Sequence, residues 1–125
     1  MPPSASQRPV VLIVEDEFLV RIGTRAALDT AGFDVIEAGD ADEAIAILAA
    51  RKNVRLIFTD IHMPGSMDGL KLAHFVRNRW PPVKIVATSG RARIAESDLP
   101  EGGRFVPKPY SAAEITTTLR ELIQG

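Results

Sequence analysis

The stretch LIFTDIHMPGSMDG, residues 56–69, starts as an apolar strand and then reaches a carboxylate, Asp60, where a turn begins. Pro64 and Gly65 follow, and such residues favour a tight turn because proline fixes φ and glycine permits positive φ. In open α/β sheets, ligands bind beyond the carboxyl ends of the strands. The stretch therefore predicts a buried strand that delivers Asp60 to a functional site.

Apolar segments like this one recur along the chain, and helical patterns separate them. The expected strands are residues 10–14, 34–38, 54–59, 83–88 and 104–107. The first of them, VVLIV, is apolar at every position, which is typical of a strand buried on both faces of a parallel sheet. The alternation predicts an α/β fold: a five-stranded parallel sheet with right-handed crossovers and helices on both faces.

The first expected helix follows residue 17. Its apolar residues are Phe18, Leu19, Ile22, Ala26 and Ala27. Their spacing of three and four residues predicts an amphipathic helix with one apolar face.

The other helices show start and stop signals. Asp40 with Glu43, and Ser111 with Glu114, form the capping-box spacing that opens a helix. A third pattern covers residues 69–79 and ends before two prolines. A weaker helical pattern at residues 92–97 runs into a loop rich in proline and glycine.

The bulk composition is that of an ordinary globular protein of 125 residues, with 46% hydrophobic and 25% charged residues. We expect residues 1–8 to be a disordered lead-in and residues 9–125 to form one domain. The net charge of −1 gives no support for nucleic-acid or membrane binding. No apolar run approaches the roughly 20 residues of a membrane span. The absence of cysteine excludes disulfides and fits a cytoplasmic protein.

Polar side chains follow four of the five expected strands. They are Glu15, Asp16, Asp60, Thr88, Ser89 and Lys108. Because the carboxyl ends of parallel strands lie along one edge of a sheet, we expect these side chains to converge. Any one of them alone would be read as a turn former, a helix cap or a solvated charge.

The negative charges of three carboxylates in one crevice repel one another and must be compensated. At ~4 Å and an effective dielectric constant of ~20, each like-charged pair costs about 4 kcal/mol. Lys108 offsets part of this, and a divalent cation would offset more. Oxygen ligands favour Mg²⁺ or Ca²⁺, and Mg²⁺ fits a site with few carboxylates better. Together with a lysine and a hydroxyl, these groups suit phosphoryl transfer to Asp60 as a nucleophile.

Four short motifs at these strand ends match a known family. They are VEDE at residues 14–17, DIHMPGSMDG at 60–69, ATSG at 87–90 and KPY at 108–110. With these four motifs in this order, the chain resembles the receiver domain of two-component response regulators, in particular the single-domain, chemotaxis-regulator-like form. The resemblance implies a doubly wound, flavodoxin-like sheet of strand order 2-1-3-4-5.

The resemblance also implies a phosphorelay function. Asp60 would accept a phosphoryl group from a histidine kinase or a histidine phosphotransfer protein. The implied Mg²⁺ ligands are Glu15, Asp16, Asp60 and the backbone carbonyl of His62. Such a domain catalyses its own modification and is not normally classed as an enzyme.

The remaining implied roles concern the phosphoryl group and the switch. Thr88 and Lys108 would contact the phosphoryl group, and the Lys108–Pro109 bond would be cis. Thr88 and Phe105 would form the switch that changes the affinity for a downstream protein. The small Ser89 would leave water access to the phosphoaspartate.

The chain departs from the family's common form in three places. The loop after Asp60 carries two residues, Gly65 and Ser66, where one is usual. Phe105 has no hydroxyl, so a switch there must work by packing. The segment between Thr88 and Lys108 is short, which affects the surface by which such domains usually signal.

Two other functions fit parts of the pattern. A Mg²⁺-dependent phosphohydrolase of the haloacid-dehalogenase type would require a second Asp at position 62, which is His. A receiver-like adaptor that signals without phosphate would not need the complete set of acidic and basic residues. The sequence is compatible both with a free-standing receiver and with a receiver that is part of a longer hybrid protein.

Overall fold

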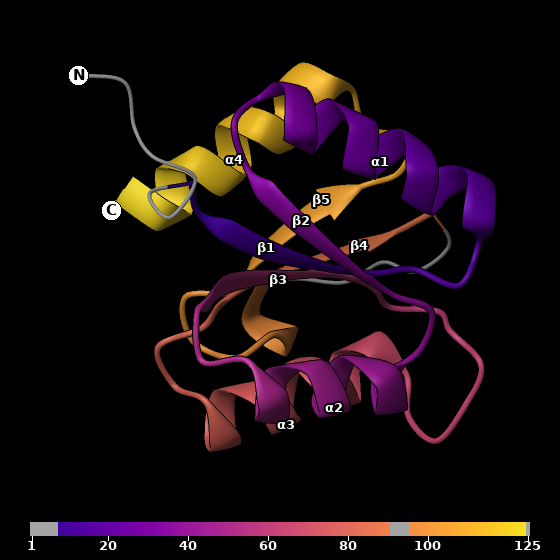
Figure 1. Cartoon of the computed structure of the whole chain (residues 1–125). Coiled ribbons are helices and arrows are strands. Elements are labelled where there is room, and N and C mark those ends of the chain that lie inside the picture. Colours follow the sequence, from indigo (N-terminus) through magenta and orange to yellow (C-terminus); the bar gives the residue numbers. More distant parts are fainter. Residues whose placement is uncertain (1–7, 91–95, 125) are drawn as a thin grey trace.

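The computed structural model describes residues 8–90 and 96–124. Its strands are β1 (Val10–Val14), β2 (Asp34–Ala38), β3 (Val54–Asp60), β4 (Lys84–Ser89) and β5 (Arg104–Pro107). Its helices are α1 (Phe18–Thr30), α2 (Ala41–Ala50), α3 (Gly69–Arg79), α4 (Ala112–Gln124) and the short 3-10 helix η2 (Glu96–Asp98). Figure 1 shows the sheet between two helical layers, with α1 and α4 on one face and α2 and α3 on the other.

The sheet has the predicted topology. All neighbouring strands pair in parallel, and the strand order is β2-β1-β3-β4-β5. The α/β fold and the 2-1-3-4-5 order are therefore confirmed. The strand bounds also agree with the prediction, except that β3 includes Asp60 and β4 lies one residue later.

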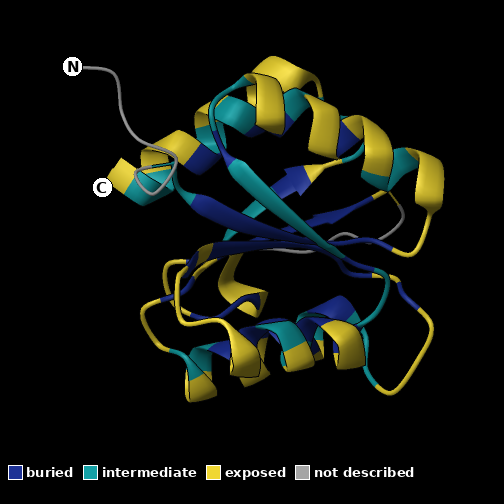
Figure 2. Cartoon of the chain, viewed as in Figure 1, coloured by how far each residue is buried: buried dark blue, intermediate teal, exposed yellow. Residues whose placement is uncertain are grey.

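The continuous apolar pattern of β1 follows from burial on both sides. Leu12 and Val14 belong to the core under α2 and α3, whereas Val11 and Ile13 belong to the core under α1 and α4. Successive residues of a strand point to opposite faces, so a central strand needs apolar side chains throughout. Figure 2 shows the central strands buried and the outer sides of the helices exposed.

The first helix forms as predicted, but most of its predicted apolar face points outward. Phe18 is 61% exposed, Leu19 82% and Ile22 43%. The buried residues of α1 are instead Thr24 and Leu28. The spacing of apolar residues therefore identified the helix and misidentified the side that packs on the sheet.

The predicted helix starts are confirmed by their hydrogen bonds. The Asp40 side chain accepts from the Glu43 amide at 2.9 Å. The Ser111 hydroxyl accepts from the Glu114 amide, and the Glu114 carboxylate accepts from the Ser111 amide, both at 3.0 Å. This reciprocal pair is a complete capping box. Asp68 caps α3 in the same way, through the Lys71 amide at 2.9 Å.

The predicted helix at residues 92–97 lies mostly outside the described residues. From Glu96 to Asp98 the chain forms a 3-10 helix. Leu99 then inserts into a small apolar cluster with Ile61 and Ala87, against which Phe105 packs. The segment before β5 is thus anchored to the sheet by an apolar side chain.

A hydrogen bond joins α1 to the chain that follows β5. The Thr24 and Tyr110 hydroxyls form a hydrogen bond with an O···O distance of 2.6 Å. The Tyr110 ring meets Phe58 of β3 edge-on, with ring centroids 5.4 Å apart. Burial raises the pKa of Tyr110 above its ordinary value.

Tyr110 should therefore titrate above pH 10. It is the single tyrosine of the chain, so tyrosinate absorbance reports on it alone. Because its pKa is raised in the folded state, stability is complete below the ordinary pKa of about 10 and falls as the pH rises from there through the folded pKa. The urea-unfolded chain is the control, and a folded midpoint at or below the unfolded one would contradict the buried position.

Candidate functional site

The structure brings the predicted strand-end residues to one edge of the sheet. Asp60 is the last residue of β3 and lies in register with Thr88 of β4. Backbone hydrogen bonds continue the pairing just beyond the strands, from Ile61 N to Thr88 O at 2.9 Å and from Lys108 N to Ser89 O at 3.1 Å. These bonds hold the first loop residues in place, so the functional side chains are attached to a well-fixed backbone.

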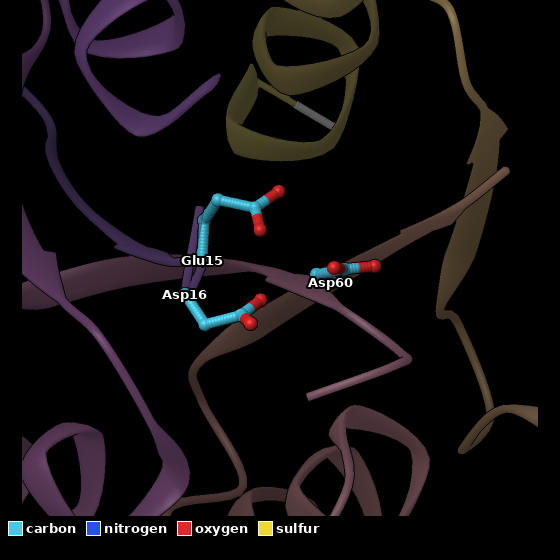
Figure 3. Close-up of side chains that lie close together, drawn as sticks. All are labelled: Glu15, Asp16 and Asp60. Carbon is cyan, nitrogen blue, oxygen red and sulfur yellow. The ribbon is translucent and has the colours of Figure 1, made fainter. Parts of the chain in front are cut away.

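The three carboxylates form one cluster. Glu15, Asp16 and Asp60 each offer an oxygen, and the three oxygens lie within 4.8 Å of one another. Figure 3 shows Glu15 and Asp16 beyond the end of β1, with Asp60 beside them. Glu15 and Asp60 are buried, whereas Asp16 is exposed. Oxygen atoms in this number and spacing suit a hard divalent cation such as Mg²⁺.

Lys108 lies against two of these carboxylates. Its Nζ is 2.8 Å from Glu15 Oε1 and 3.4 Å from Asp60 Oδ2. Burial raises the pKa of Glu15, and the nearby charge of Asp60 adds to this effect. Burial alone would lower the pKa of Lys108, but its hydrogen bond to Glu15 and the charge of Asp60 outweigh burial and raise it. Lys108 is therefore held as a cation beside Asp60.

One buried hydroxyl in the site has no partner. Among the described residues, none forms a hydrogen bond with Thr88 Oγ1, and Thr88 is 2% exposed. Buried polar atoms are nearly always satisfied, so a free one next to the acidic cluster is suited to an incoming ligand. The residues present thus fit both a Mg²⁺ ion and a phosphoryl oxygen.

A cavity of about 520 Å³ opens onto the cluster. Its lining residues are Asp16, Glu17, Asp60, His62, Met63, Pro64, Asp68, Gly90 and Lys108. The cavity gives a small phosphorylated ligand or side chain a route to Asp60 and Lys108. The exposed side chain of His62 forms part of its wall.

The one extra residue in the loop after Asp60 is accommodated by contacts with α2. Gly65 adopts a φ of 112°, which favours glycine. The Ser66 hydroxyl donates to Asp42 Oδ1 at 2.5 Å. The longer loop is therefore fastened to α2, and Asp68 still caps the start of α3.

Comparison with known proteins identifies the family. The family model described as "Response regulator receiver domain" matches residues 11–120. The chain belongs to this family. The resemblance in the four strand-end motifs is thereby confirmed for nearly the whole chain.

Relatives of this receiver domain occur in sensor kinases and in regulators. It is 36% identical over 118 residues to the sensor kinase CckA of Brucella abortus, covering 91% of this chain and 12% of that protein. It is 33% identical over 120 residues to the aerobic respiration control protein ArcA of Escherichia coli, covering 94% of this chain and 49% of that protein. The receiver domain thus spans half or less of the length of these relatives.

Solved structures show the same fold. A response regulator receiver protein from Sinorhizobium medicae has a TM-score of 0.88 at 24% identity, over 95% of this chain and 97% of that one. The receiver domain of the hybrid histidine kinase CckA has a TM-score of 0.77 at 28% identity, over 92% and 99% of the two chains. The response regulator TrrA of Thermotoga maritima, solved in complex with Mg²⁺-BeF, has a TM-score of 0.80 at 23% identity, over 91% and 98%.

Some features of the site were not predicted from the sequence. Arg21 of α1 donates to the backbone carbonyl of Glu15, and Tyr110 bonds to Thr24. Each contact joins residues from different elements of the fold, so local sequence patterns do not indicate it. The one hint in the sequence is the position of Arg21, one turn into the helix that follows the acidic pair. Phe105 was predicted as a switch residue and lies half-buried against Ile61, Ala87 and Leu99. The Lys108–Pro109 bond is cis, as the resemblance implied.

Proposed function

We propose that this receiver domain is the phosphoacceptor of a two-component or phosphorelay system, with Asp60 as the acceptor. The observation that carries the proposal is the position of the buried Asp60 carboxylate, 3.4 Å from Lys108 Nζ and within 4.8 Å of two further carboxylates. Asp60 thus lies beside the Lys108 ammonium and lines an open cavity, where its carboxylate can act as a nucleophile toward an incoming phosphoryl group.

The acidic cluster would hold Mg²⁺. The proposed ligands are the side chains of Glu15, Asp16 and Asp60 and the backbone carbonyl of His62. When bound, Mg²⁺ neutralises negative charge on the phosphoryl oxygens and on the attacking carboxylate. A Mg²⁺ complex of the similar regulator TrrA supports this choice of metal.

The side chains of the site carry out the other parts of phosphoryl transfer and hydrolysis. An Asp60 oxygen attacks phosphorus, the bond from phosphorus to the donor histidine nitrogen breaks, and that nitrogen keeps the electron pair. Lys108 bonds to a phosphoryl oxygen in place of its present contact with Asp60. The free Thr88 hydroxyl donates to another phosphoryl oxygen. Water later attacks phosphorus, releases phosphate and restores the carboxylate, and the small Ser89 leaves space for this water.

The exposed apolar side of α1 suggests where the phosphodonor binds. Phe18 and Leu19 are 61% and 82% exposed. A mostly apolar groove of about 610 Å³ lies between α1 and the start of α4, and it shares Lys108 and Gly90 with the site cavity. We propose that a histidine kinase or a histidine phosphotransfer protein covers this surface and presents its phosphohistidine to Asp60.

The output would be a change in protein binding. A phosphoryl group adds about −1.5 to −2 charge beside Thr88. Phe105 now packs against Ile61 and Leu99. If Thr88 moves toward the phosphoryl group, the Phe105 ring can change its packing on these neighbours. We propose that the surface around Phe105 binds a protein target in the cytoplasm.

Within residues 8–90 and 96–124, none of the helices has the length and apolar character needed to cross a membrane.

Intact mass after incubation with acetyl phosphate tests the function. We expect the wild-type chain to gain one phosphoryl group with Mg²⁺ and none with EDTA, and Asp60→Asn to gain none. No gain by the wild-type chain with Mg²⁺ would reject the proposal and favour an adaptor that works without phosphate. Multiple turnover of a general phosphate ester would favour the phosphohydrolase.

A further inference from the structure

The exposed carboxylate of the cluster has no direct support of its own. Among the described residues, the Asp16 side chain makes no hydrogen bond and no ion pair, and it is exposed. Lys108, by contrast, holds the buried Glu15 at 2.8 Å. The position of Asp16 must therefore be set by the peptide groups on either side of it.

Each of these peptide groups is held by a specific bond. On one side, Arg21 Nη1 donates to the carbonyl oxygen of Glu15 at 2.7 Å. On the other side, the Glu17 amide donates to Glu15 Oε2 at 3.1 Å. The Arg21 amide also donates to the carbonyl of Glu17 at 3.0 Å. Arg21 thus holds the loop that carries Asp16 at two points, one through its side chain and one through its backbone.

The guanidinium of Arg21 is itself fixed. Its Nε donates to Glu37 Oε1 of β2 at 3.0 Å, and both side chains are about one-fifth exposed. Its Cζ lies 5.6 Å from the centre of the Phe18 ring. Hydrogen bonds from Arg25 and Arg21 lower the pKa of Glu37, so this carboxylate stays ionised at neutral pH. A planar guanidinium can bond Glu37 and Glu15 O at once, whereas an ammonium lacks this fork.

We infer that Arg21 is a positioning residue for the metal site: it bridges Glu37 of β2 to the Glu15 carbonyl and so holds Asp16 where a Mg²⁺ ligand is needed. The inference rests on the proposed function for the identity of the metal. Arg21 touches neither the metal nor the phosphoryl group in this role. Residues that orient ligands in this way typically change metal affinity by about 10- to 100-fold.

The test compares Arg21→Ala with Arg25→Ala in the full chain. Arg25 also pairs with Glu37, but it has no contact with the Glu15 carbonyl, so it is a matched control. By Mg²⁺ titration calorimetry we expect Arg21→Ala to bind about 10-fold more weakly or worse, and Arg25→Ala to bind as the wild type does. Arg21→Lys should fall between, since an ammonium replaces only one of the two bonds.

The dependence of phosphorylation on Mg²⁺ separates positioning from catalysis. For Arg21→Ala the half-saturating Mg²⁺ concentration should rise, while the rate with acetyl phosphate at saturating Mg²⁺ should match that of the wild type. A lower rate at saturation with an unchanged half-saturating concentration would overturn the inference. Thermal unfolding identifies a variant that fails to fold, and Arg21→Lys then replaces Arg21→Ala.

Hydrogen exchange in the metal-free protein gives an independent readout. We expect the Glu17 amide to exchange faster in Arg21→Ala than in Arg25→Ala, because the loop is released at the Glu15 carbonyl. Equal exchange of this amide, together with equal Mg²⁺ affinity, would overturn the inference and leave the proposed function standing. A wild-type chain that binds no Mg²⁺ would instead reject the metal site itself, and the role of Arg21 with it.

Discussion

Gly69→Ala is expected to lose about 3 kcal/mol or more of unfolding free energy, at the upper end of what overpacking costs. A Cβ built on Gly69 would lie 1.9 Å from the backbone oxygen of Asp60 and 2.8 Å from the Cα of Ile61. The Gly69 amide also donates to the carbonyl of Ile61 at 2.8 Å. Because both obstructing groups are backbone, neither can rotate away, and Asp60 itself would have to move.

Urea unfolding of Gly69→Ala beside Gly23→Ala gives the comparison. Gly23 lies inside α1, and an added Cβ there meets no atom within 4 Å. Alanine in a helix interior is favoured over glycine by about 1 kcal/mol, so Gly23→Ala should be as stable as the wild type or more so. The folded fraction of Gly69→Ala should also accept less phosphoryl group. If Gly69→Ala unfolds at the wild-type urea concentration, the close packing of α3 on the end of β3 is wrong.

Asp60→Asn should stabilise the metal-free protein while abolishing its phosphorylation. Asp60 is buried beside two other carboxylates, and Lys108 offsets only part of their repulsion. Removing one charge from such a cluster relieves repulsion and desolvation, for which we expect a gain of about 1–2 kcal/mol. Stability of this kind is commonly sacrificed at functional sites.

Asp40→Asn is the control for this change. Asp40 is the N-cap of α2 and lies outside the acidic cluster, and asparagine caps a helix about as well as aspartate. Its stability should stay within about 0.5 kcal/mol of the wild type. If Asp60→Asn is less stable than the wild type in EDTA, then the cluster is not under electrostatic strain and another contact of Asp60 holds the fold.

The strands could be predicted from the sequence because burial on both faces leaves a continuous apolar run. Val11 and Ile13 face one core while Leu12 and Val14 face the other, so no polar position interrupts the pattern. The inner face of α1 could not be predicted in this way. Thr24 is buried because its hydroxyl meets Tyr110, whereas Leu19 remains exposed.

The convergence of the site residues followed from topology alone. In a parallel sheet, residues that directly follow the strands must meet at one edge, and Glu15, Asp60 and Lys108 do so. The supports of the site depend instead on how far a long side chain reaches between elements. The bond from Arg21 to the Glu15 carbonyl is of this kind, and no sequence spacing specifies it.

Mapping the phosphoryl group to a residue tests the role of Asp60 most directly. The chain would be phosphorylated with acetyl phosphate and Mg²⁺, reduced with borohydride, digested and sequenced by tandem mass spectrometry. Reduction converts an aspartyl phosphate to homoserine, so we predict homoserine at position 60 and unmodified Asp16 and His62. Modification at another residue with an unmodified Asp60, or no modification in a folded chain with bound Mg²⁺, would contradict the assignment of Asp60 as the phosphoacceptor.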